Sequence, residues 1–261
     1  MIGIFDSGLG GLSVLAAITH ALPQADLCYL ADTAHVPYGE KSDAFIRERV
    51  LTIAHQLVAQ GCTLIVVACN TATAAAVADL RIALPQIPII GVEPGIKPAA
   101  AASRSGRITV LTTVSTARSE RLHSLIRRYA GAVTVDVLPC PEWATRIEQR
   151  RVDSPEFHDS VRAHLAPSLD AGSDHVVLGC THYTFLRPIL EPLVDGRAIL
   201  VDVTDAVARQ CVRLAGPAAL GHGQLALLAT ARPEALHGAL SAFGLHALAG
   251  RLSGPAQLAL L

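Results

Sequence analysis

The chain has 261 residues, of which 51% are hydrophobic and only 16% carry a charged side chain. Aromatic residues make up 4%, so alanine, valine, leucine and isoleucine must supply the core. The net charge is −1 and no block of like charges occurs, which argues against a nucleic-acid partner or an anionic membrane surface. A chain of this length forms one large domain or two small ones, and its charge favours a small-molecule ligand.

The N-terminus carries no basic stretch followed by an apolar core and a cleavage site. We therefore expect a cytoplasmic protein whose cysteines are thiols rather than disulfides. Residues 50–78 contain no Asp, Glu, Lys or Arg, but glutamine, asparagine and threonine side chains interrupt the run. The run predicts a helix, a strand and a second helix rather than a membrane span.

Short apolar runs alternate with amphipathic or alanine-rich stretches along the chain. This alternation predicts βα units, and hence an α/β fold with mostly parallel sheets covered by helices on both faces. The predicted strands are, in chain order, 2–5, 27–30, 63–68, 87–92, 108–112, 133–138, 175–179, 198–202 and 225–230.

Helix boundaries are marked by capping residues. Ser42, Thr116 and Thr204 stand where helical stretches begin, and a glycine follows each stretch as a candidate C-cap. Residues 99–107, AAAASRSGR, are the segment that we expect to link two lobes, because their Ser/Arg/Gly end resembles a flexible linker.

The stretch GIFDSGLGGLSVL, residues 3–15, places an acid and three glycines directly after the first strand. With Asp32 at the end of the next strand, it imitates a dinucleotide-binding pattern. The match is incomplete, because Ser13 replaces the third glycine and Asp6 would repel a pyrophosphate. A tight turn that needs small residues is the simpler explanation. It leaves Asp6 unexplained, and as a polar side chain at a loop mouth, outside the core, Asp6 can hold a substrate ammonium group.

A faint repeat places a cysteine at the same point in each half of the chain. Residues 64–75, LIVVACNTATAA, resemble residues 175–186, HVVLGCTHYTFL, and each is a strand followed by a cysteine and a helix start. Ligands bind at the carboxyl ends of such strands, and the N–H groups of a helix N-terminus favour a thiolate. Cys69 and Cys180 are therefore candidate proton-transfer groups. The remaining cysteines suit packing roles: Cys28, Cys62, Cys140 and Cys211.

Other thiol chemistries fit less well. A structural zinc site needs four ligands in close pairs, which the sequence lacks. A Cys–His hydrolase would use Cys180 and His182 but leave the second cysteine without a role, and a purely structural His182 at a helix start stays open. A pyridoxal enzyme needs a Schiff-base lysine, and neither Lys41 nor Lys97 lies at a strand end. We therefore expect neither a metal nor a cofactor.

Five segments occur in order between residue 2 and about residue 245: DSGLGGLSVL, DTAHVPYGEKS, ACNTATA, GVEPGIKPA and LGCTHYTFL. As a set they resemble the motif series of glutamate racemases, within the cofactor-independent aspartate/glutamate racemase superfamily. The resemblance implies two pseudo-symmetric α/β lobes with the active site in the cleft between them. One lobe would comprise residues 1–97 completed by 207–261, and the other residues 98–206.

The resemblance also implies racemisation of L-glutamate to D-glutamate by two thiols, which supplies D-glutamate for peptidoglycan synthesis. The protein would bind glutamate and neither nucleic acid nor a membrane. Whether it forms a homodimer stays open. Motif by motif, it makes Cys69 and Cys180 the catalytic acid/bases, with Asp6, His182 and Glu148 as helpers. The substrate-binding residues would be Asp6, Ser7, Pro37, Tyr38, Gly39, Asn70, Thr71, Thr113, Thr116, Thr181 and His182.

The residues themselves agree with this chemistry. Inverting a stereocentre requires one group to remove the α-proton and another to deliver a proton to the opposite face, and two thiols from two similar lobes supply this pair. Two alternatives stay open. One is a sister racemase for aspartate or another amino acid, and the other is a dinucleotide-binding protein that uses the glycine loop for phosphate.

Overall fold

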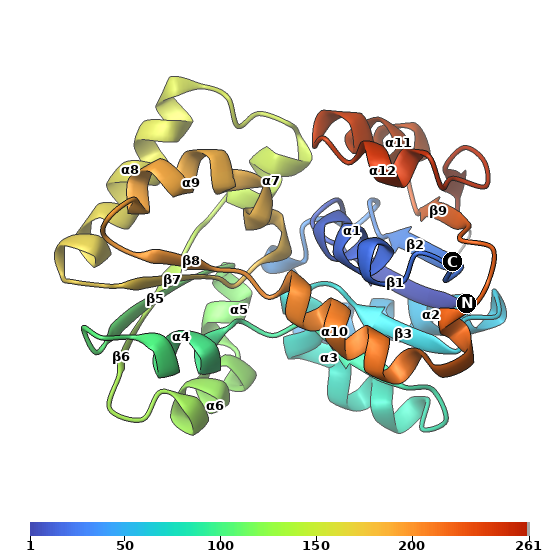
Figure 1. The fold of residues 1–261 in the computed structure, drawn as a ribbon, viewed down its shortest axis with the longest axis horizontal. Coiled ribbons are helices and arrows are strands. Elements are labelled where there is room, and N and C mark those ends of the chain that lie inside the picture. The colour runs from blue at the N-terminus through green and yellow to red at the C-terminus, as the bar shows by residue number, and fades with distance from the viewer. Residues whose placement is uncertain (260–261) are drawn as a thin grey trace. The chain divides into compact units, whose positions relative to one another are not determined.

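The computed structural model describes residues 1–259, which fall into two compact units (Figure 1). The first unit comprises Met1–Val92 together with the segment that begins at Thr204. The second comprises Glu93–Val203. The chain therefore leaves the first unit once and later returns to it.

The first unit is built on a parallel sheet with the strand order β10-β9-β2-β1-β3-β4. Its central strand β1 pairs with β2 on one side and with β3 on the other, so that Ile4 lies between Tyr29 and Val66. The strands are β1 (Ile2–Asp6), β2 (Leu27–Ala31), β3 (Leu64–Val67), β4 (Ile89–Gly91), β9 (Leu225–Ala229) and β10 (Gln257–Leu258).

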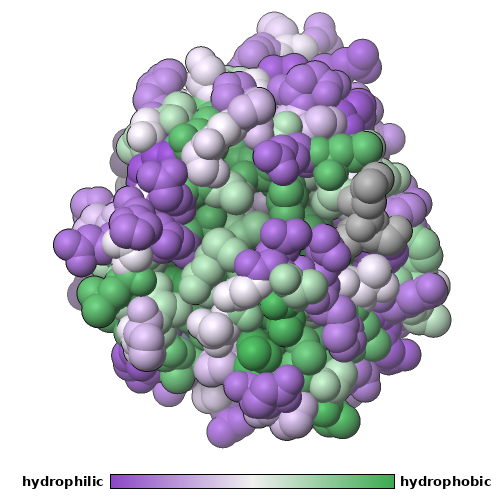
Figure 2. All heavy atoms as spheres, turned by 90° about the vertical axis from the view of Figure 1, so that its right-hand side faces the viewer, coloured by the Kyte–Doolittle hydropathy of each residue, from purple (hydrophilic) through white to green (hydrophobic). Residues whose placement is uncertain are grey.

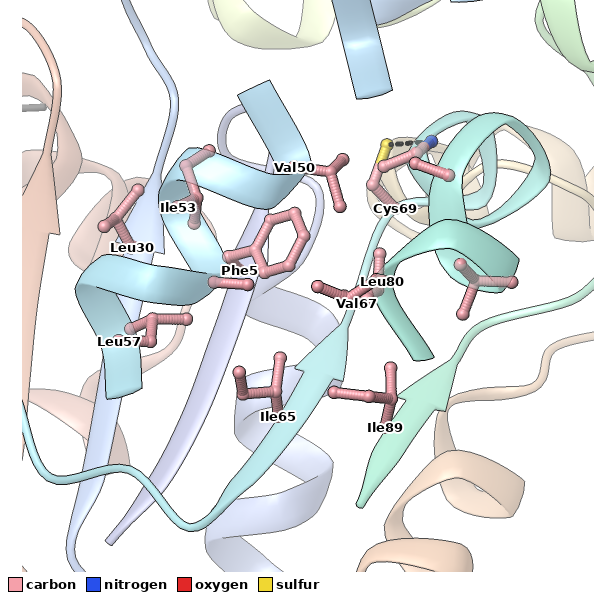
Figure 3. Close-up of a cluster of buried hydrophobic side chains, with 14 of the residues drawn as sticks. Phe5, Leu30, Val50, Ile53, Leu57, Ile65, Val67, Cys69, Leu80 and Ile89 are labelled. Atoms are coloured by element: carbon pink, nitrogen blue, oxygen red, sulfur yellow. Dashed lines mark hydrogen bonds between the residues drawn. The ribbon is translucent and has the colours of Figure 1, made fainter. Parts of the chain in front are cut away.

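Two long helices cover one face of this sheet. Figure 3 shows Phe5 and Val67 of the strands packed against Val50, Leu57 and Leu80 of those helices. This close packing of branched side chains stabilises the central strands. The helices are α2 (Asp43–Ala59) and α3 (Asn70–Ala83), while α1 (Leu12–Ala21) and α10 (Thr204–Ala215) pack against each other. Shorter helices are η1 (Tyr38–Glu40), η3 (Gly216–Ala219), α11 (Pro233–Ala242) and α12 (His246–Ala249).

The second unit repeats the same arrangement with four parallel strands in the order β6-β5-β7-β8. In chain order this matches β2-β1-β3-β4 of the first unit, so β7 is the counterpart of β3. The strands are β5 (Arg107–Thr112), β6 (Thr134–Pro139), β7 (His175–Leu178) and β8 (Ile199–Val201). The helices are α4 (Ile96–Ala102), α5 (Val114–Arg118), α6 (Glu120–Tyr129), α7 (Trp143–Glu148), α8 (Pro155–Asp170), η2 (Thr181–Leu186) and α9 (Arg187–Val194). The predicted α/β fold with two parallel sheets flanked by helices is confirmed.

Most helix signals of the sequence are confirmed. The Ser42 side chain accepts the backbone N–H of Phe45 and caps α2. Glycines follow α2, α6 and α10 with left-handed φ angles of 87° at Gly61, 58° at Gly131 and 49° at Gly216. Glycine adopts this conformation without a steric cost, which explains why each helix ends there.

The helix start predicted at Thr116 is wrong. The segment forms two helices, and Thr113 caps α5 while Ser119 caps α6. Each hydroxyl accepts the backbone N–H of the residue three positions later, so the chain has two helix starts where the sequence suggested one.

The linker predicted at residues 99–107 is also wrong. The alanine run belongs to α4, whose Ile96 and Ala99 lie in the core of the second unit. The turn that follows is held by the Asp174 carboxylate, which accepts hydrogen bonds from the Ser103 hydroxyl at 2.8 Å and from the Ser105 N–H at 2.8 Å. Alanine favours helix strongly, and here that preference prevails.

Hydrophobic and hydrophilic side chains are interleaved on the face shown in Figure 2. Within residues 1–259, no helix combines the length and apolar character that crossing a membrane requires. The uncharged run 50–78 is part of α2, then β3, then α3, as predicted. Large hydrophobic side chains that are exposed include Ile82, Ile199, Val212, Leu214, Leu220 and Leu258.

Candidate functional site

The predicted site residues form two groups, one in each unit. Both groups follow the carboxyl ends of parallel strands, where α/β proteins bind ligands. The first group comprises Asp6 and Ser7 after β1, Pro37, Tyr38 and Gly39 after β2, and Cys69, Asn70 and Thr71 after β3. The second comprises Thr113 and Thr116 after β5, Glu148 on α7, and Cys180, Thr181 and His182 after β7.

Cys69 caps helix α3 in the first group. Its sulfur accepts the backbone N–H of Ala72 at 3.5 Å (Figure 3), and its thiol lies 3.8 Å from the hydroxyl oxygen of Ser7. Only 6% of the residue is exposed. A sulfur that faces the N-terminal N–H groups of a helix is in a position that stabilises negative charge.

The glycine loop wraps closely around Asp6. An Asp6 carboxylate oxygen accepts the Gly8 N–H at 2.8 Å, and the Tyr29 hydroxyl donates to the Gly8 carbonyl at 2.7 Å. A Cβ atom at Gly11 would lie 2.6 Å from the Asp6 Cβ and 2.9 Å from the Tyr29 hydroxyl oxygen. The glycine at this point is therefore explained by close packing. The expectation that Asp6 stands at a loop mouth is wrong, because the residue is fully buried.

Asn70 offers an unused donor in the first group. Its Nδ2 is buried and has no hydrogen-bond partner within the described part of the chain. Buried polar atoms are almost always paired, so an unpaired donor beside Cys69 is available to an atom of a ligand.

The carboxylate of Asp32 does not suit a nucleotide ribose. The residue is fully buried, and both of its oxygens accept hydrogen bonds from Arg49 and from hydroxyl groups. This arrangement argues against the dinucleotide-binding alternative, which requires Asp32 to face a ligand.

In the second group, His182 bridges Glu148 and Cys180. Its Nε2 lies 2.6 Å from a Glu148 carboxylate oxygen, and its Nδ1 lies 3.7 Å from the Cys180 sulfur. Burial alone would lower the pKa of His182, but the hydrogen bonds to Cys180 and Glu148 and the charges of both groups raise this pKa well above its usual value. An imidazolium at this position places a positive charge against the Cys180 sulfur.

Two threonines stand at the end of β5. The Thr113 hydroxyl donates to the Thr116 hydroxyl at 3.0 Å and accepts the Thr116 N–H at 3.2 Å. Both residues are buried. The pair fixes the first turn of α5 and keeps two hydroxyl groups at this end of the sheet.

An aromatic cluster supports the second group, and the sequence patterns did not reveal it. Trp143 at the start of α7 packs edge-to-face against Tyr183 of η2, with ring centroids 5.4 Å apart. The Tyr183 hydroxyl donates to the Cys140 carbonyl at 3.2 Å. These contacts connect α7, which carries Glu148, with η2, which carries His182.

Two of the remaining thiols, Cys140 and Cys211, and both lysines have the environments of structural residues. Burial raises the pKa of the Cys211 thiol to about 12 and also raises the pKa of Cys140, so both stay protonated. Lys97 is exposed with its ammonium 5.5 Å from the centre of the Tyr129 ring, and Lys41 is exposed. Among residues 1–259, no three His, Cys, Asp or Glu side chains are placed to hold a metal ion.

Comparison with known proteins identifies relatives that match most of this chain. A family model described as Asp/Glu/Hydantoin racemase matches residues 6–211. The chain is 49% identical over 215 residues to the glutamate racemase of Ectopseudomonas mendocina, which covers 82% of this chain and 82% of that protein.

Solved structures agree in fold. The structure of Escherichia coli glutamate racemase in complex with L-glutamate and the activator UDP-MurNAc-ala matches with a TM-score of 0.84 and 33% identity, covering 100% of this chain and 98% of that one. Thermus thermophilus glutamate racemase in complex with β-chloro-D-alanine matches with a TM-score of 0.77 and 33% identity, covering 100% and 96%. The family model spans most of the chain and agrees with its fold and its ordered motifs, so the chain belongs to the Asp/Glu/Hydantoin racemase family.

Proposed function

We propose that this protein interconverts L- and D-glutamate, with Cys69 and Cys180 as the two proton-transfer groups. One observation carries the proposal: β7 holds the same place in the four-stranded sheet as β3 holds among the corresponding four strands of the six-stranded sheet, and a cysteine stands at the N-cap position of the helix after each. The relatives, which are named glutamate racemases, support glutamate as the substrate. D-Glutamate made in this way would supply peptidoglycan synthesis.

The proposed reaction replaces the proton on the α-carbon with another proton on the opposite face and leaves every other bond of glutamate in place. A thiolate of one cysteine takes the α-proton of glutamate and becomes a thiol. The thiol of the other cysteine gives its proton to the opposite face of the α-carbon and becomes a thiolate. The product has the opposite configuration, the two cysteines have exchanged protonation states, and the reverse reaction uses the same groups in the opposite order.

The surrounding groups support this chemistry. The His182 imidazolium, held by Glu148, places a positive charge beside the Cys180 sulfur, which is the atom that gains negative charge when it releases a proton. In the first unit, the helix N–H of Ala72 contacts the Cys69 sulfur. The carbanion formed between the two steps needs preorganised donors, and the free Asn70 Nδ2 is one candidate.

Substrate recognition is assigned to the polar groups at the same strand ends. In the first unit, the substrate-binding groups are Asp6, Ser7, the segment Pro37–Gly39 and Thr71. In the second unit, they are Thr113, Thr116, Thr181 and His182.

Circular dichroism of glutamate tests the activity. Dialysed protein incubated with L-glutamate should drive the signal to zero, and the same end point should be reached from D-glutamate. A constant signal from both enantiomers at high protein concentration would exclude the activity. Pretreatment with a chelator and a carbonyl reagent should leave the rate unchanged, since thiols carry the proton in this scheme.

A substrate panel separates the sister activity. Aspartate and other amino acids should lose their dichroism much more slowly than glutamate at equal concentration. Faster loss with aspartate would assign the protein to the sister racemase.

A further inference from the structure

Asp32, at the end of β2, is held by three side chains from three segments. Its Oδ2 accepts hydrogen bonds from the Tyr38 hydroxyl at 2.6 Å and from Arg49 Nε at 3.0 Å. Its Oδ1 accepts from Arg49 Nη2 at 2.9 Å and from the Thr230 hydroxyl at 2.8 Å. The three segments are η1, α2 and the end of β9, which are far apart in sequence.

The Asp32–Arg49 ion pair is largely shielded from water. The Asp32 side chain is 0% exposed and the Arg49 side chain 15%. Two parallel N–H···O bonds from one guanidinium fix the plane of the carboxylate, and a buried pair needs such geometry to offset its desolvation. The direction in which Asp32 accepts from Tyr38 is therefore fixed as well.

The Tyr38 side chain points inward rather than toward a ligand. Its ring is 1% exposed and lies in the same hydrophobic cluster as Cys69 and Val50. Burial and the charge of Asp32 raise the pKa of Tyr38, so its hydroxyl remains a donor. Pro37 and Gly39 on either side are only half-buried, which leaves the main chain of this segment for contact with a substrate.

The segment after β9 fastens the turn that leads into residues 37–39. The Thr230 hydroxyl accepts the Ala34 N–H at 2.9 Å in addition to its bond to Asp32. The Ala231 N–H donates to the Thr33 hydroxyl at 2.9 Å, and that hydroxyl donates to the Ala231 carbonyl. Residues from the far end of the chain thus hold both the carboxylate and the backbone of the turn.

We propose that Asp32, Arg49 and Thr230 are positioning residues that act through the Tyr38 hydroxyl to hold residues 37–39 in the arrangement that binds the substrate beside Cys69. The inference rests on the proposed function, since it assumes that residues 37–39 contact the amino acid. Weakening the anchor lowers the fraction of molecules with a competent segment, which raises KM by the inverse of that fraction. Saturating glutamate restores the competent arrangement, so kcat changes little.

Two variants that conserve shape test the anchor. Tyr38→Phe and Thr230→Val each remove one hydroxyl and should raise the KM for glutamate about tenfold while kcat stays within about twofold. Thr230→Ser keeps the hydroxyl and should return KM to the wild-type value. Thr109→Val is the matched control, because it also removes a buried hydroxyl, one that forms a 2.8 Å hydrogen bond with the Ser173 hydroxyl in the second unit. The KM of this control should not change.

The double variant Tyr38→Phe/Thr230→Val tests whether both hydroxyls act through Asp32. Its KM should rise by less than the product of the two single effects, because the shared partner is already released by either change. Independent effects that multiply, or an unchanged KM in both folded single variants, would overturn the anchor. If the hydroxyl variants fail to fold, Arg49→Lys provides the test. It keeps the charge but loses the paired geometry, and should raise KM about threefold.

Hydrogen exchange measured by mass spectrometry provides a readout that does not depend on catalysis. Backbone amides of residues 33–41 should exchange faster in Tyr38→Phe and Thr230→Val than in the wild type and in Thr109→Val. If the wild type fails to racemise glutamate but exchange still rises, the proposed function is wrong and the anchor stands. If the wild type racemises glutamate while exchange and KM stay at wild-type values in the variants, the anchor is wrong.

Discussion

The cysteines share one chemical group but have different surroundings. All six are buried thiols rather than disulfides, yet the Cys69 sulfur accepts a helix N–H and the Cys180 sulfur contacts an imidazole. The position of each at the end of a strand could be predicted from the sequence alone. No local sequence pattern predicts Glu148 as the partner of the His182 imidazole, because the two residues are 34 positions apart. Only the family resemblance indicated a role for Glu148.

The two thiols can be assigned to opposite faces of the substrate by isotope exchange. Cys69→Ser and Cys180→Ser each replace a thiol with a hydroxyl that is too weakly acidic to transfer protons near neutral pH, so racemisation should fall about a hundredfold or more. The remaining thiol should still exchange the α-proton of one enantiomer in heavy water, and the two variants should prefer opposite enantiomers. Proton NMR of L- and D-glutamate measures this exchange.

Cys211→Ser is the control for thiol loss, because Cys211 is a buried residue of α10 outside both groups of site residues, and the rate of this variant should match the wild type. Near wild-type racemisation by either active-site variant would refute the two-thiol mechanism. A shared preference for one enantiomer would refute the assignment of one thiol to each face.

His182 should make the stability of the protein depend on pH. Its pKa is raised above the unfolded value of about 6.5, so its stabilising contribution is complete below that pH and is lost as pH rises through the higher folded pKa. Glu148→Gln removes one cause of the shift and should move this loss to lower pH. Urea unfolding between about pH 6 and pH 9 measures it.

The matched control is Glu120→Gln, which removes an exposed partner of Arg127. Its stability profile should keep the wild-type shape through this pH range. A Glu148→Gln profile that also keeps the wild-type shape would show that Glu148 does not sustain the charge on His182.

Helices and strands were the most predictable level of this protein. Each predicted strand forms, because apolar runs of β-branched residues between helices specify buried parallel strands. The two-residue strand β10 was missed, since its residues are exposed and too few to carry a pattern. The helix start directly after Cys180 was also predicted, but residues 181–186 form a 3₁₀ helix rather than an α-helix.

The start of α1 depends on the absence of a side chain at Gly11. Gly11→Ala would place a Cβ 2.6 Å from that of Asp6 and 3.2 Å from that of Ala68, so the helix or the Asp6 loop must move. We expect a loss of about 1–3 kcal/mol in the free energy of unfolding and a lower turnover. Gly254→Ala, where no atom lies within 4 Å, should change neither quantity. Equal stability of the two variants would contradict the packing explanation.

At the scale of the whole molecule, the first unit is assembled from two separated parts of the chain. Arg251 joins them, because its guanidinium donates to the carbonyls of Gly223 at 2.7 Å, Thr19 at 3.2 Å and Ala25 at 2.6 Å. Like the contacts of Thr230, these bonds could not be predicted from the sequence. Two of the Arg251 bonds join residues more than two hundred positions apart, with separations of 232 to Thr19 and 226 to Ala25.

Arg251→Met should destabilise the first unit by about 2–3 kcal/mol, since three partly buried carbonyls lose a charged donor. The only tryptophan, Trp143, lies in the second unit, so its fluorescence follows that unit alone. The unfolding transition of the variant followed by far-ultraviolet circular dichroism should therefore begin at a lower urea concentration than the transition followed by tryptophan fluorescence. Arg47→Met removes a half-exposed ion pair with Asp79 and should shift neither transition. Coincident transitions in Arg251→Met would mean that the units unfold together.

The return of the chain to its first unit has a consequence for biosynthesis. A ribosome makes residues 1–92 first, yet β2 receives its neighbour β9 and Asp32 receives Thr230 only after the whole second unit has been translated. Until then the nascent chain exposes an open strand edge and a carboxylate that lacks one of its partners. The second unit is continuous in sequence and can fold completely while the first unit still lacks its C-terminal segment. Catalytic competence should therefore arise late and abruptly, once residues 225–231 have left the exit tunnel.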